Sequence, residues 1–300
     1  MGVIIVGYLY EEKLEIAKKM RESFKHAPMS EYQRSYIEQV SVKKCELETR
    51  NGKSNYYHIE GKNRNSNSPL VVIAHGGGFC VGYSEADTAF AAMIAVETNS
   101  LVLDIDYKLA PEYTFPVAYE ELYDIVKWAY DNADKLGFDK SKIVLCGSSA
   151  GGNIVAAVAM EAIKTKDFEI KLQILNYPGT DLYTDPAEKP GADKLFITLE
   201  QARAFNSLYL ASEEDAKNPY VSMVFATEDM LKGLPEALLI TGGLDNLHEE
   251  AEKYGFMMME AGVKITMKRF LNSNHAFIVR CTGDEWLEAH KLIAKTIVDM

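Results

Sequence analysis

Small residues surround a serine whose chemistry stands out in this chain. Gly147, Ser149 and Gly151 follow the apolar run Lys142–Cys146 and precede a run rich in alanine and valine. That order predicts a strand, a tight turn and a helix, with Ser149 held in a strained turn. The flanking glycines let backbone approach closely, and the first N–H groups of the helix face the serine. The segment therefore predicts a nucleophilic serine, with the N–H of Ala150 as a donor to an oxyanion.

The Gly-x-Ser-x-Gly pattern alone does not decide this chemistry. A chain of this length with ordinary glycine and serine contents matches the pattern by chance about one time in ten. A glycine-rich turn that packs a helix onto a sheet, or a phosphate-binding loop, would show the same residues. The deciding evidence is whether oxyanion donors, a base and an acid occur in the right order along the chain.

A run of three glycines after an earlier predicted strand supplies further donors. The apolar segment Leu70–Ala74 ends in the sequence His-Gly-Gly-Gly-Phe, residues 75–79. Consecutive glycines can turn their N–H groups toward a carbonyl oxygen without side chains in the way. We expect Gly77 and Gly78 to complete the oxyanion hole with Ala150, although a flexible turn or a phosphate nest would also use such a run.

Position in the chain selects the base. A base that serves a serine on such a turn lies after it, on a loop beyond a late strand. His275 follows the predicted strand Ile265–Phe270 and lies in a polar turn. The remaining histidines lie on predicted helices or a strand, in the glycine run, or too near the candidate acid: His26, His58, His75, His248 and His290. We therefore predict His275 as the base, with His75 bracing the glycine loop.

The acid should lie between the serine and the histidine. Asp245 follows the predicted strand Ala237–Thr241 on a loop, and a helix begins just after it. A helix N-cap is the other interpretation of this aspartate, and Asp229 is an alternative acid that precedes the strand. With Asp245, the order is serine, acid, histidine, as in the Ser-Asp-His arrangement built on parallel sheets.

The elements that must position these residues alternate along the chain. We expect an α/β fold with a mixed, mostly parallel sheet of about eight strands flanked by helices. The expected strands are Lys43–Thr49, Asn55–Glu60, Leu70–Ala74, Leu101–Asp106, Lys142–Cys146, Lys171–Asn176, Ala237–Thr241 and Ile265–Phe270. The expected helices are Glu11–Phe24, Ser30–Gln39, Thr88–Thr98, Pro116–Asp131, Ala150–Lys164, Thr198–Leu210, Glu249–Ala261 and Glu285–Val298.

Two segments interrupt the alternation. Residues 1–40 precede the sheet, and residues 182–222 lie between its sixth and seventh strands. We interpret residues 1–40 as N-terminal cap helices and residues 182–222 as a second cap insertion. Residues 41–181 and 223–300 then form the catalytic core, and plain surface helices are the alternative. Ligands of open α/β sheets bind at the carboxyl ends of the strands, which a cap would cover.

Composition limits the classes of partner. A chain of 300 residues with 47% hydrophobic residues and a formal net charge of −12 is not expected to bind nucleic acid. Neither a secretory leader nor an 18-residue apolar run is found, so no stable membrane anchor is expected. The four cysteines show no metal-binding spacing and are expected to be buried free thiols of a cytoplasmic protein, with no metal. The expected partner is a small-molecule substrate, and a homodimer is a further candidate.

The motifs together resemble one known family. The glycine run at 75–79, the sequence Asp-Tyr-Lys-Leu-Ala-Pro-Glu at 106–112 and the Phe-Pro pair at 115–116 carry the first part of the match. The serine turn at 147–153, Asp-Asn-Leu at 245–247 and His-Ala-Phe at 275–277 carry the rest. The chain is similar to the hormone-sensitive-lipase-like carboxylesterases and acetyl esterases of the α/β-hydrolase fold. The resemblance spans about residues 70–277 and implies a capped, cofactor-free serine esterase.

Three residues depart from the family pattern. Ser148 precedes the nucleophile where the family usually has Asp, Glu or Thr. Ala276 stands where a glycine usually follows the histidine, and Asn246 stands where proline usually follows the acid. None of these changes removes a reactive group, so we expect an effect on the shape of the site and on substrate preference.

The resulting prediction is hydrolysis of short carboxylic esters, of the acetyl or butyryl type, through an acyl-enzyme. Alternatives are a sugar or xylan deacetylase, a small peptidase, and a ligand-binding protein of this fold with a decayed triad. Five residues are candidates to line the pocket: one at the end of the glycine run, the residue before the nucleophile, one aromatic residue early in the predicted second cap and two on its helix. These candidates are Phe79, Ser148, Tyr183, Phe205 and Tyr209. Phe196 is a further aromatic residue of the second cap, although such aromatics more often form the core of a cap.

Overall fold

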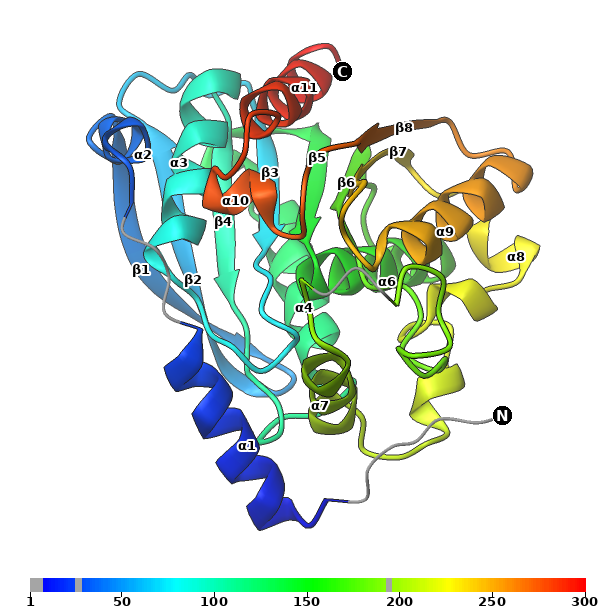
Figure 1. The fold of residues 1–300 in the computed structure, drawn as a ribbon. Helices are drawn as coiled ribbons and strands as arrows, with labels where there is room; N and C mark the ends of the chain where they lie inside the picture. The colour runs from blue at the N-terminus through cyan, green and yellow to red at the C-terminus, as the bar shows by residue number, and fades with distance from the viewer. Residues whose placement is uncertain (1–7, 25–28, 193–195) are drawn as a thin grey trace.

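An eight-stranded sheet forms the centre of the computed structural model, which describes residues 8–24, 29–192 and 196–300. The strand order is β1-β2-β4-β3-β5-β6-β7-β8 (Figure 1). β1 and β2 form an antiparallel hairpin, and β2 also runs antiparallel to β4. Every other pair of neighbouring strands is parallel. The predicted α/β class and its mixed, mostly parallel sheet are therefore confirmed.

The strands and the longer helices follow the predicted order, and three four-residue helices, α5, α8 and α10, were not predicted. The strands are β1 (Val40–Thr49), β2 (Gly52–Gly61), β3 (Ser68–Ala74), β4 (Leu101–Asp106), β5 (Phe138–Ser148), β6 (Leu172–Asn176), β7 (Glu236–Gly242) and β8 (Ile265–Phe270). The helices are α1 (Tyr10–Ser23), α2 (Glu31–Ile37), α3 (Glu85–Thr98), α4 (Val117–Asp131), α5 (Ala133–Leu136), α6 (Ala150–Thr165), α7 (Leu199–Tyr209), α8 (Glu228–Leu231), α9 (His248–Glu260), α10 (Phe277–Arg280) and α11 (Trp286–Val298).

Differences from the expected elements occur mainly at their ends. Helix α3 begins three residues earlier than expected, because the Asp87 carboxylate accepts hydrogen bonds from the N–H (2.9 Å) and Oγ (2.6 Å) of Ser84. This contact satisfies the backbone N–H of Ser84 and fixes the first turn of the helix. Of the two cysteines expected to be buried on strands, Cys146 is buried and Cys45 is only partly buried. His26 lies outside the described residues.

Both faces of the sheet are covered by helices. In β3, Val71 and Ile73 belong to the core under α3 and α11, whereas Leu70 and Val72 belong to the core shared with α4, α6 and α9. Successive side chains of a strand point to opposite faces, so both faces need apolar residues. This double burial explains the continuous apolar runs in the sequence. It also anchors the carboxyl ends of β3, β5, β7 and β8.

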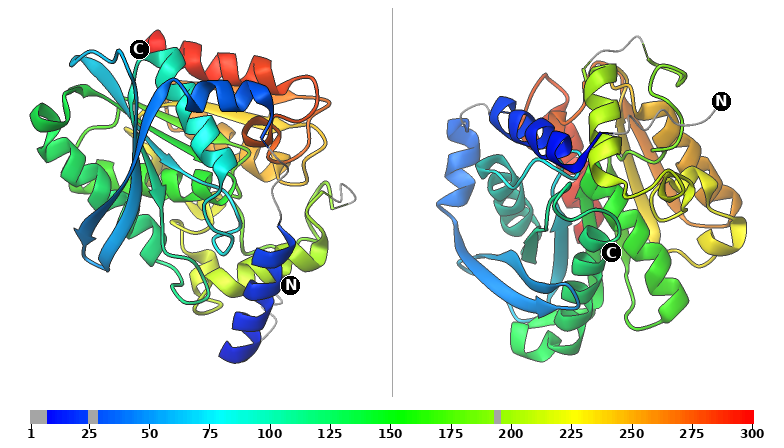
Figure 2. Two further views of the ribbon diagram at one scale, coloured as in Figure 1. Left: turned by 90° about the vertical axis from the view of Figure 1, so that its left-hand side faces the viewer. Right: turned by 90° about the horizontal axis from the view of Figure 1, so that it is seen from below.

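The predicted cap segments lie in different places. Figure 2 shows α1 beside α7 when the molecule is seen from below, and the two helices are in contact. Arg21 of α1 donates to the carbonyls of Cys80 (2.8 Å) and Ala110 (2.9 Å) and to the Glu112 carboxylate (2.7 Å). Helix α2 instead packs against α3 and β1, away from α7.

Candidate active site

The turn after β5 holds Ser149 in a backbone conformation that few residues adopt. Its φ is 56° and its ψ is −118°, and it directly precedes α6. A Cβ on Gly147 would overlap the backbone of Gly151, and one on Gly151 would overlap the carbonyl of Ala74. The N–H of Ser149 donates to the carbonyl of Asn176 at 2.9 Å. Close packing of β3, β5 and α6 therefore fixes the turn and leaves the hydroxyl pointing out of the sheet edge.

The structure brings the three predicted catalytic side chains together. His275 Nε2 lies 2.8 Å from Ser149 Oγ, and His275 Nδ1 lies 2.7 Å from Asp245 Oδ2. Asp245 is fully buried after β7, and its Oδ1 accepts the N–H of Leu247 at 3.0 Å. A carboxylate on Nδ1 keeps the proton on that nitrogen, so Nε2 is free to accept the serine proton.

Backbone packing holds the loops that carry the acid and the histidine side by side. A Cβ on Gly242 would lie 2.5 Å from the carbonyl oxygen of Ser273, and the N–H of Leu244 donates to the same oxygen at 3.0 Å. Tyr177 packs edge-on against the His275 ring, with centroids 5.1 Å apart. Tyr177 was not predicted from the sequence, although it directly follows β6 at the same sheet edge.

The glycine loop after β3 lies beside the serine. A Cβ built on Gly76 would contact that of Ser149 at 3.4 Å. Gly77 and Gly78 have φ values of 118° and 56°, which favour glycine, and within the described chain neither N–H donates a hydrogen bond. Ala150 is the first residue of α6, where N–H groups have no partner within the helix. The three N–H groups predicted as oxyanion donors therefore lie on the two backbone segments next to the Ser149 hydroxyl.

The histidine at the start of this loop has a packing role. The ring of His75 stacks on Tyr107 with centroids 4.1 Å apart, and its Nδ1 lies 2.6 Å from the carbonyl oxygen of Gly76. The Tyr107 hydroxyl donates to the His75 carbonyl at 3.0 Å. These contacts match the predicted bracing role. Of the other histidines, His248 contacts the carbonyl of Asp245 and His290 pairs with Glu97.

A pocket of about 250 Å³ opens at the serine. Three of the five residues predicted to line it do so, namely Phe79, Ser148 and Phe205. Tyr183 and Tyr209 do not line it, so their prediction is corrected. The ring of Tyr209 stacks on that of Phe79, with centroids 3.7 Å apart. The ring of Tyr183 packs edge-on against that of Phe225, with centroids 5.4 Å apart. Both tyrosines therefore pack with other aromatic side chains and do not face the pocket. The sequence pattern alone does not tell such packed aromatics from pocket-lining ones.

The pocket also has a lining that the sequence did not reveal. Phe24, at the end of α1, and Val279 face it without having been predicted, and Phe196, an aromatic residue of the predicted cap, faces it as well. Polar side chains from the loop after β6, from the insertion, and from α9 and the loop before it line it as well: Asp181, Lys189, Gln201, Asn206, Asn246 and Glu250. Their separation along the chain hid this grouping, since only folding brings Asp181 and Lys189 against Glu250 of α9.

Buried groups near the site have shifted pKa values. Burial raises the pKa of the Cys146 thiol to about 12, so this thiol stays protonated and is not a competing nucleophile at neutral pH. Burial also raises the pKa of Glu250, although the nearby Lys189 ammonium lowers it in part. Within the described ranges, no group of three His, Cys, Asp or Glu side chains could hold a metal ion, and no helix is long and apolar enough to cross a membrane.

A serine on a strand-turn-helix, followed by an acid and a histidine on later loops of a mostly parallel sheet, defines the α/β-hydrolase class. Comparisons with known proteins agree. A family model described as the alpha/beta hydrolase fold matches residues 71–279. An arylesterase of Saccharolobus solfataricus is 33% identical over 72% of this chain and 70% of its own length. A carboxylesterase of Mycobacterium tuberculosis, NlhH, is 31% identical over 71% of this chain and 67% of its own.

Solved structures give the same result. A hyperthermophilic esterase from the archaeon Pyrobaculum calidifontis superimposes with a TM-score of 0.82 at 31% identity, covering 95% of this chain and 93% of that one. The thermophilic carboxylesterase EstE1, cloned from a metagenomic library, gives a TM-score of 0.83 at 28% identity, covering 96% and 97%. The chain therefore belongs to the α/β-hydrolase family, in its hormone-sensitive-lipase-like group of carboxylic ester hydrolases. The family resemblance predicted from the motifs is confirmed.

Proposed function

We propose that the protein hydrolyses short-chain carboxylic esters, from acetyl to butyryl, with Ser149 as nucleophile, His275 as base and Asp245 as the acid that orients it. The observation that carries the proposal is the unbroken hydrogen-bonded chain from Ser149 Oγ through the imidazole to the buried carboxylate. Serine is a poor nucleophile by itself and needs a positioned base, which this chain supplies.

The residues act in a fixed order in this proposal. His275 Nε2 takes the hydroxyl proton as Ser149 Oγ attacks the ester carbonyl. The N–H groups of Gly77, Gly78 and Ala150 stabilise the oxyanion of the tetrahedral intermediate. His275 then gives its proton to the leaving alcohol, activates a water molecule and releases the acid from the acyl-enzyme. Asp245 stabilises the imidazolium throughout.

The size of the pocket supports short substrates. Its volume of about 250 Å³ is below the roughly 300–1,000 Å³ typical of sites for drug-sized ligands. The ring of Phe205 lies against the glycine loop so closely that a Cβ on Gly78 would overlap it. A bulky acyl chain would have to displace this ring, which is packed against Phe24 with centroids 5.9 Å apart.

We also propose that the segments 1–40 and 182–222 act as the cap through α1 and α7. Phe24 at the end of α1 and Phe205 on α7 both line the pocket, which supports a covering role for these two helices. A reducing, cytoplasmic compartment is proposed on the free cysteines, of which Cys80 and Cys146 are buried.

The test is hydrolysis of p-nitrophenyl esters from acetate to laurate by the wild-type protein and by Ser149→Ala. We expect the highest kcat/KM between acetate and butyrate, and a loss on the order of 10⁶ in the variant. Ser141→Ala, at an exposed position near the start of β5, serves as the matched control. Mass spectrometry should place an organophosphonate label on Ser149. A maximum at eight carbons or beyond would overturn the chain-length assignment, and undiminished turnover by Ser149→Ala would overturn the nucleophile.

A further inference from the structure

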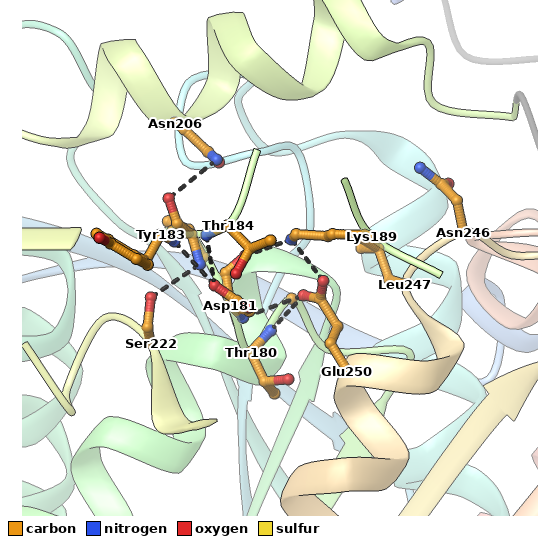
Figure 3. Close-up of polar contacts among 12 residues, drawn as sticks. Thr180, Asp181, Tyr183, Thr184, Lys189, Asn206, Ser222, Asn246, Leu247 and Glu250 are labelled. Atoms are coloured by element: carbon orange, nitrogen blue, oxygen red, sulfur yellow. Dashed lines mark hydrogen bonds and ion pairs between the residues drawn. The ribbon is translucent and has the colours of Figure 1, made fainter. Parts of the chain in front are cut away.

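One part of the pocket lining is polar, in contrast to the phenylalanines elsewhere. We call it the polar wall and define it as Asp181, Lys189, Asn206, Asn246 and Glu250, all of which line the pocket. The wall joins the loop after β6, the insertion and α7 to the first turn of α9 and the loop before it (Figure 3). None of these residues takes part in the proposed chemistry at Ser149, so their polarity needs another explanation.

Two amides of the wall present their oxygens rather than their nitrogens. Asn246 Nδ2 donates to the carbonyl of Ile197 at 3.3 Å, and Asn206 Nδ2 donates to the carbonyl of Leu182 at 3.2 Å. A carbonyl can only accept, so these bonds fix which side of each amide carries the NH₂ group. Asn246 is only 8% exposed, and within the described part of the chain its Oδ1 has no hydrogen-bond partner.

The carboxylate of Asp181 leaves a third acceptor. Its Oδ1 accepts the N–H groups of Tyr183 (3.0 Å) and Thr184 (2.9 Å). No hydrogen bond to its Oδ2 occurs among the described residues. Figure 3 shows this carboxylate held by the turn that follows it. The turn therefore directs Asp181 Oδ1 to the backbone and leaves Oδ2 available to accept a hydrogen bond from a ligand.

A buried ion pair holds the wall in place. Lys189 Nζ lies 2.5 Å from Glu250 Oε2 and also donates to the carbonyl of Asp181. Glu250 Oε1 accepts the N–H groups of Thr180 at 2.8 Å and Asp181 at 3.1 Å. The ammonium has three protons, and these contacts use two of them. Among the described residues, the wall therefore offers one donor beside three acceptor oxygens that receive no hydrogen bond, namely Asn206 Oδ1, Asn246 Oδ1 and Asp181 Oδ2.

A buried acceptor such as Asn246 Oδ1 is costly to leave without a partner, so the wall suits a ligand that supplies donors. A carboxylate or phosphate on the ligand would face the acceptor oxygens of the two amides and Asp181. An ammonium would face Lys189 and Arg280, the cations of a lining that also holds Asp87, Asp181 and Glu250, and the choline ester below tests this case. A hydroxyl group avoids both conflicts, because it donates to an amide oxygen and accepts from the lysine.

We infer that the polar wall is a subsite for a hydroxyl-bearing group of the substrate, and that Asn246 is its specificity-determining residue. The substrate class is then an uncharged hydroxylated ester, either of a polyol or of a hydroxy acid. The inference rests on the proposed esterase function. Asn246 stands where the family resemblance has proline, so the amide is an acceptor that proline could not provide.

The experiment compares matched esters with the wild-type protein. Glycerol 1-butyrate is paired with propyl butyrate, and p-nitrophenyl 3-hydroxybutyrate with p-nitrophenyl butyrate. Choline butyrate serves as the cationic ester. Rates are followed by pH-stat titration and normalised to active sites titrated with an organophosphonate. We expect at least about a tenfold higher kcat/KM for the hydroxylated member of one pair, because a site built to bind a hydroxyl discriminates against its absence.

Variants then assign the preference to the wall. Asn246→Leu should bring the ratio of kcat/KM for hydroxylated over plain ester close to one. Asn206→Leu, which lies on α7 away from the catalytic acid, should lower the same ratio and covers the case in which Asn246→Leu does not fold. Asn67→Leu is the matched control on an exposed loop, and its ratio should equal that of the wild type.

Ratios near one for both wild-type pairs would overturn the inference while leaving the esterase proposal intact. A wild-type preference that survives in both folded variants, or a choline ester that exceeds the glycerol ester, would also overturn it. Failure to hydrolyse any of the five esters would instead overturn the proposed function on which the inference rests.

Discussion

Lys189 ties the insertion between β6 and β7 to helix α9, because its ammonium lies 2.5 Å from the Glu250 carboxylate. The two side chains are 11% and 8% exposed, so little water screens them. Glu250 also holds the backbone that follows β6. The pair therefore links the insertion to the core within the pocket lining. Its removal should lower the free energy of unfolding.

Lys189→Met should destabilise the protein by about 3–5 kcal/mol, because it leaves Glu250 buried without its counter-charge. Burial already raises the pKa of Glu250, and the ammonium is what lowers it in part. A carboxyl group with a raised folded-state pKa keeps its proton when the unfolded chain has lost it. Stability in the variant should therefore fall as pH rises above about 4, more steeply than in the wild type.

Urea unfolding at several pH values checks this prediction. The double variant Lys189→Met/Glu250→Gln should recover most of the lost stability, because the glutamine oxygen can still accept the backbone N–H groups. Lys232→Met is the matched control, since its ion pair with Glu228 is exposed. A Lys189→Met protein as stable as the control at pH 8 would contradict the role given to the pair.

Asp245→Asn should lower kcat by roughly 10⁴, because the amide no longer favours the imidazole tautomer that accepts the serine proton. Asp229→Asn is the matched control: this alternative acid is 94% exposed on α8 and should keep wild-type kcat. Steady-state kinetics with p-nitrophenyl butyrate measure both. A loss below tenfold in Asp245→Asn would assign the acid elsewhere.

Asp104→Asn should make the protein more stable at pH 8 than the wild type. Asp104 is fully buried in β4, and burial raises its pKa well above the ordinary value, with Tyr83 donating to it at 2.8 Å. The native state keeps this proton above pH 4, whereas the unfolded chain releases it. The free energy of unfolding of the wild type therefore falls by up to about 1.4 kcal/mol per pH unit as the pH rises from about 4 to the folded-state pKa of Asp104.

Chemical unfolding of both proteins between pH 4 and pH 8 tests this sign. The stability difference should grow with pH and vanish near pH 4. A difference that is constant across this range would show that Asp104 is not the group that titrates.

Ala276→Gly should stabilise the protein slightly or leave its stability unchanged. Ala276 has a φ of 62°, a left-handed conformation that costs a non-glycine residue about 1–2 kcal/mol and costs glycine little. Glycine also gives the unfolded chain more conformational freedom, which offsets part of the expected stabilisation. Ala162→Gly, within α6, is the control and should cost about 1 kcal/mol. Thermal unfolding measures both changes, and equal destabilisation by the two would contradict the strain assigned to Ala276.

Arg21→Met should raise KM more than it lowers kcat. The guanidinium of Arg21 bonds two core carbonyls and Glu112, and through them it docks α1, whose last turn places Phe24 in the pocket. Loosening this helix removes part of the pocket wall without touching the Ser149–His275–Asp245 chain. Steady-state kinetics with p-nitrophenyl butyrate separate the two parameters, and a loss confined to kcat would argue against a covering role for α1.

The sequence by itself determined the fold class, the family and the positions where the reactive side chains should lie. Continuous apolar runs predicted the central strands, and glycines such as Gly147 and Gly151 marked where backbone segments must touch. Because the carboxyl ends of parallel strands share one edge, the chain order of Ser149, Asp245 and His275 was enough to predict their neighbourhood. These signals are local in the chain, which is why they can be read without a structure.

Only the tertiary structure decided which side chains face the substrate. Phe205 enters the pocket whereas Tyr209, on the same helix, packs behind Phe79, since the rotation of α7 against the glycine loop selects the face. The polar wall joins Lys189 to Glu250 across 61 residues of sequence. Its capacity to bind a ligand depends on which donors and acceptors find partners in the folded protein. The spacing of residues along the chain does not predict this.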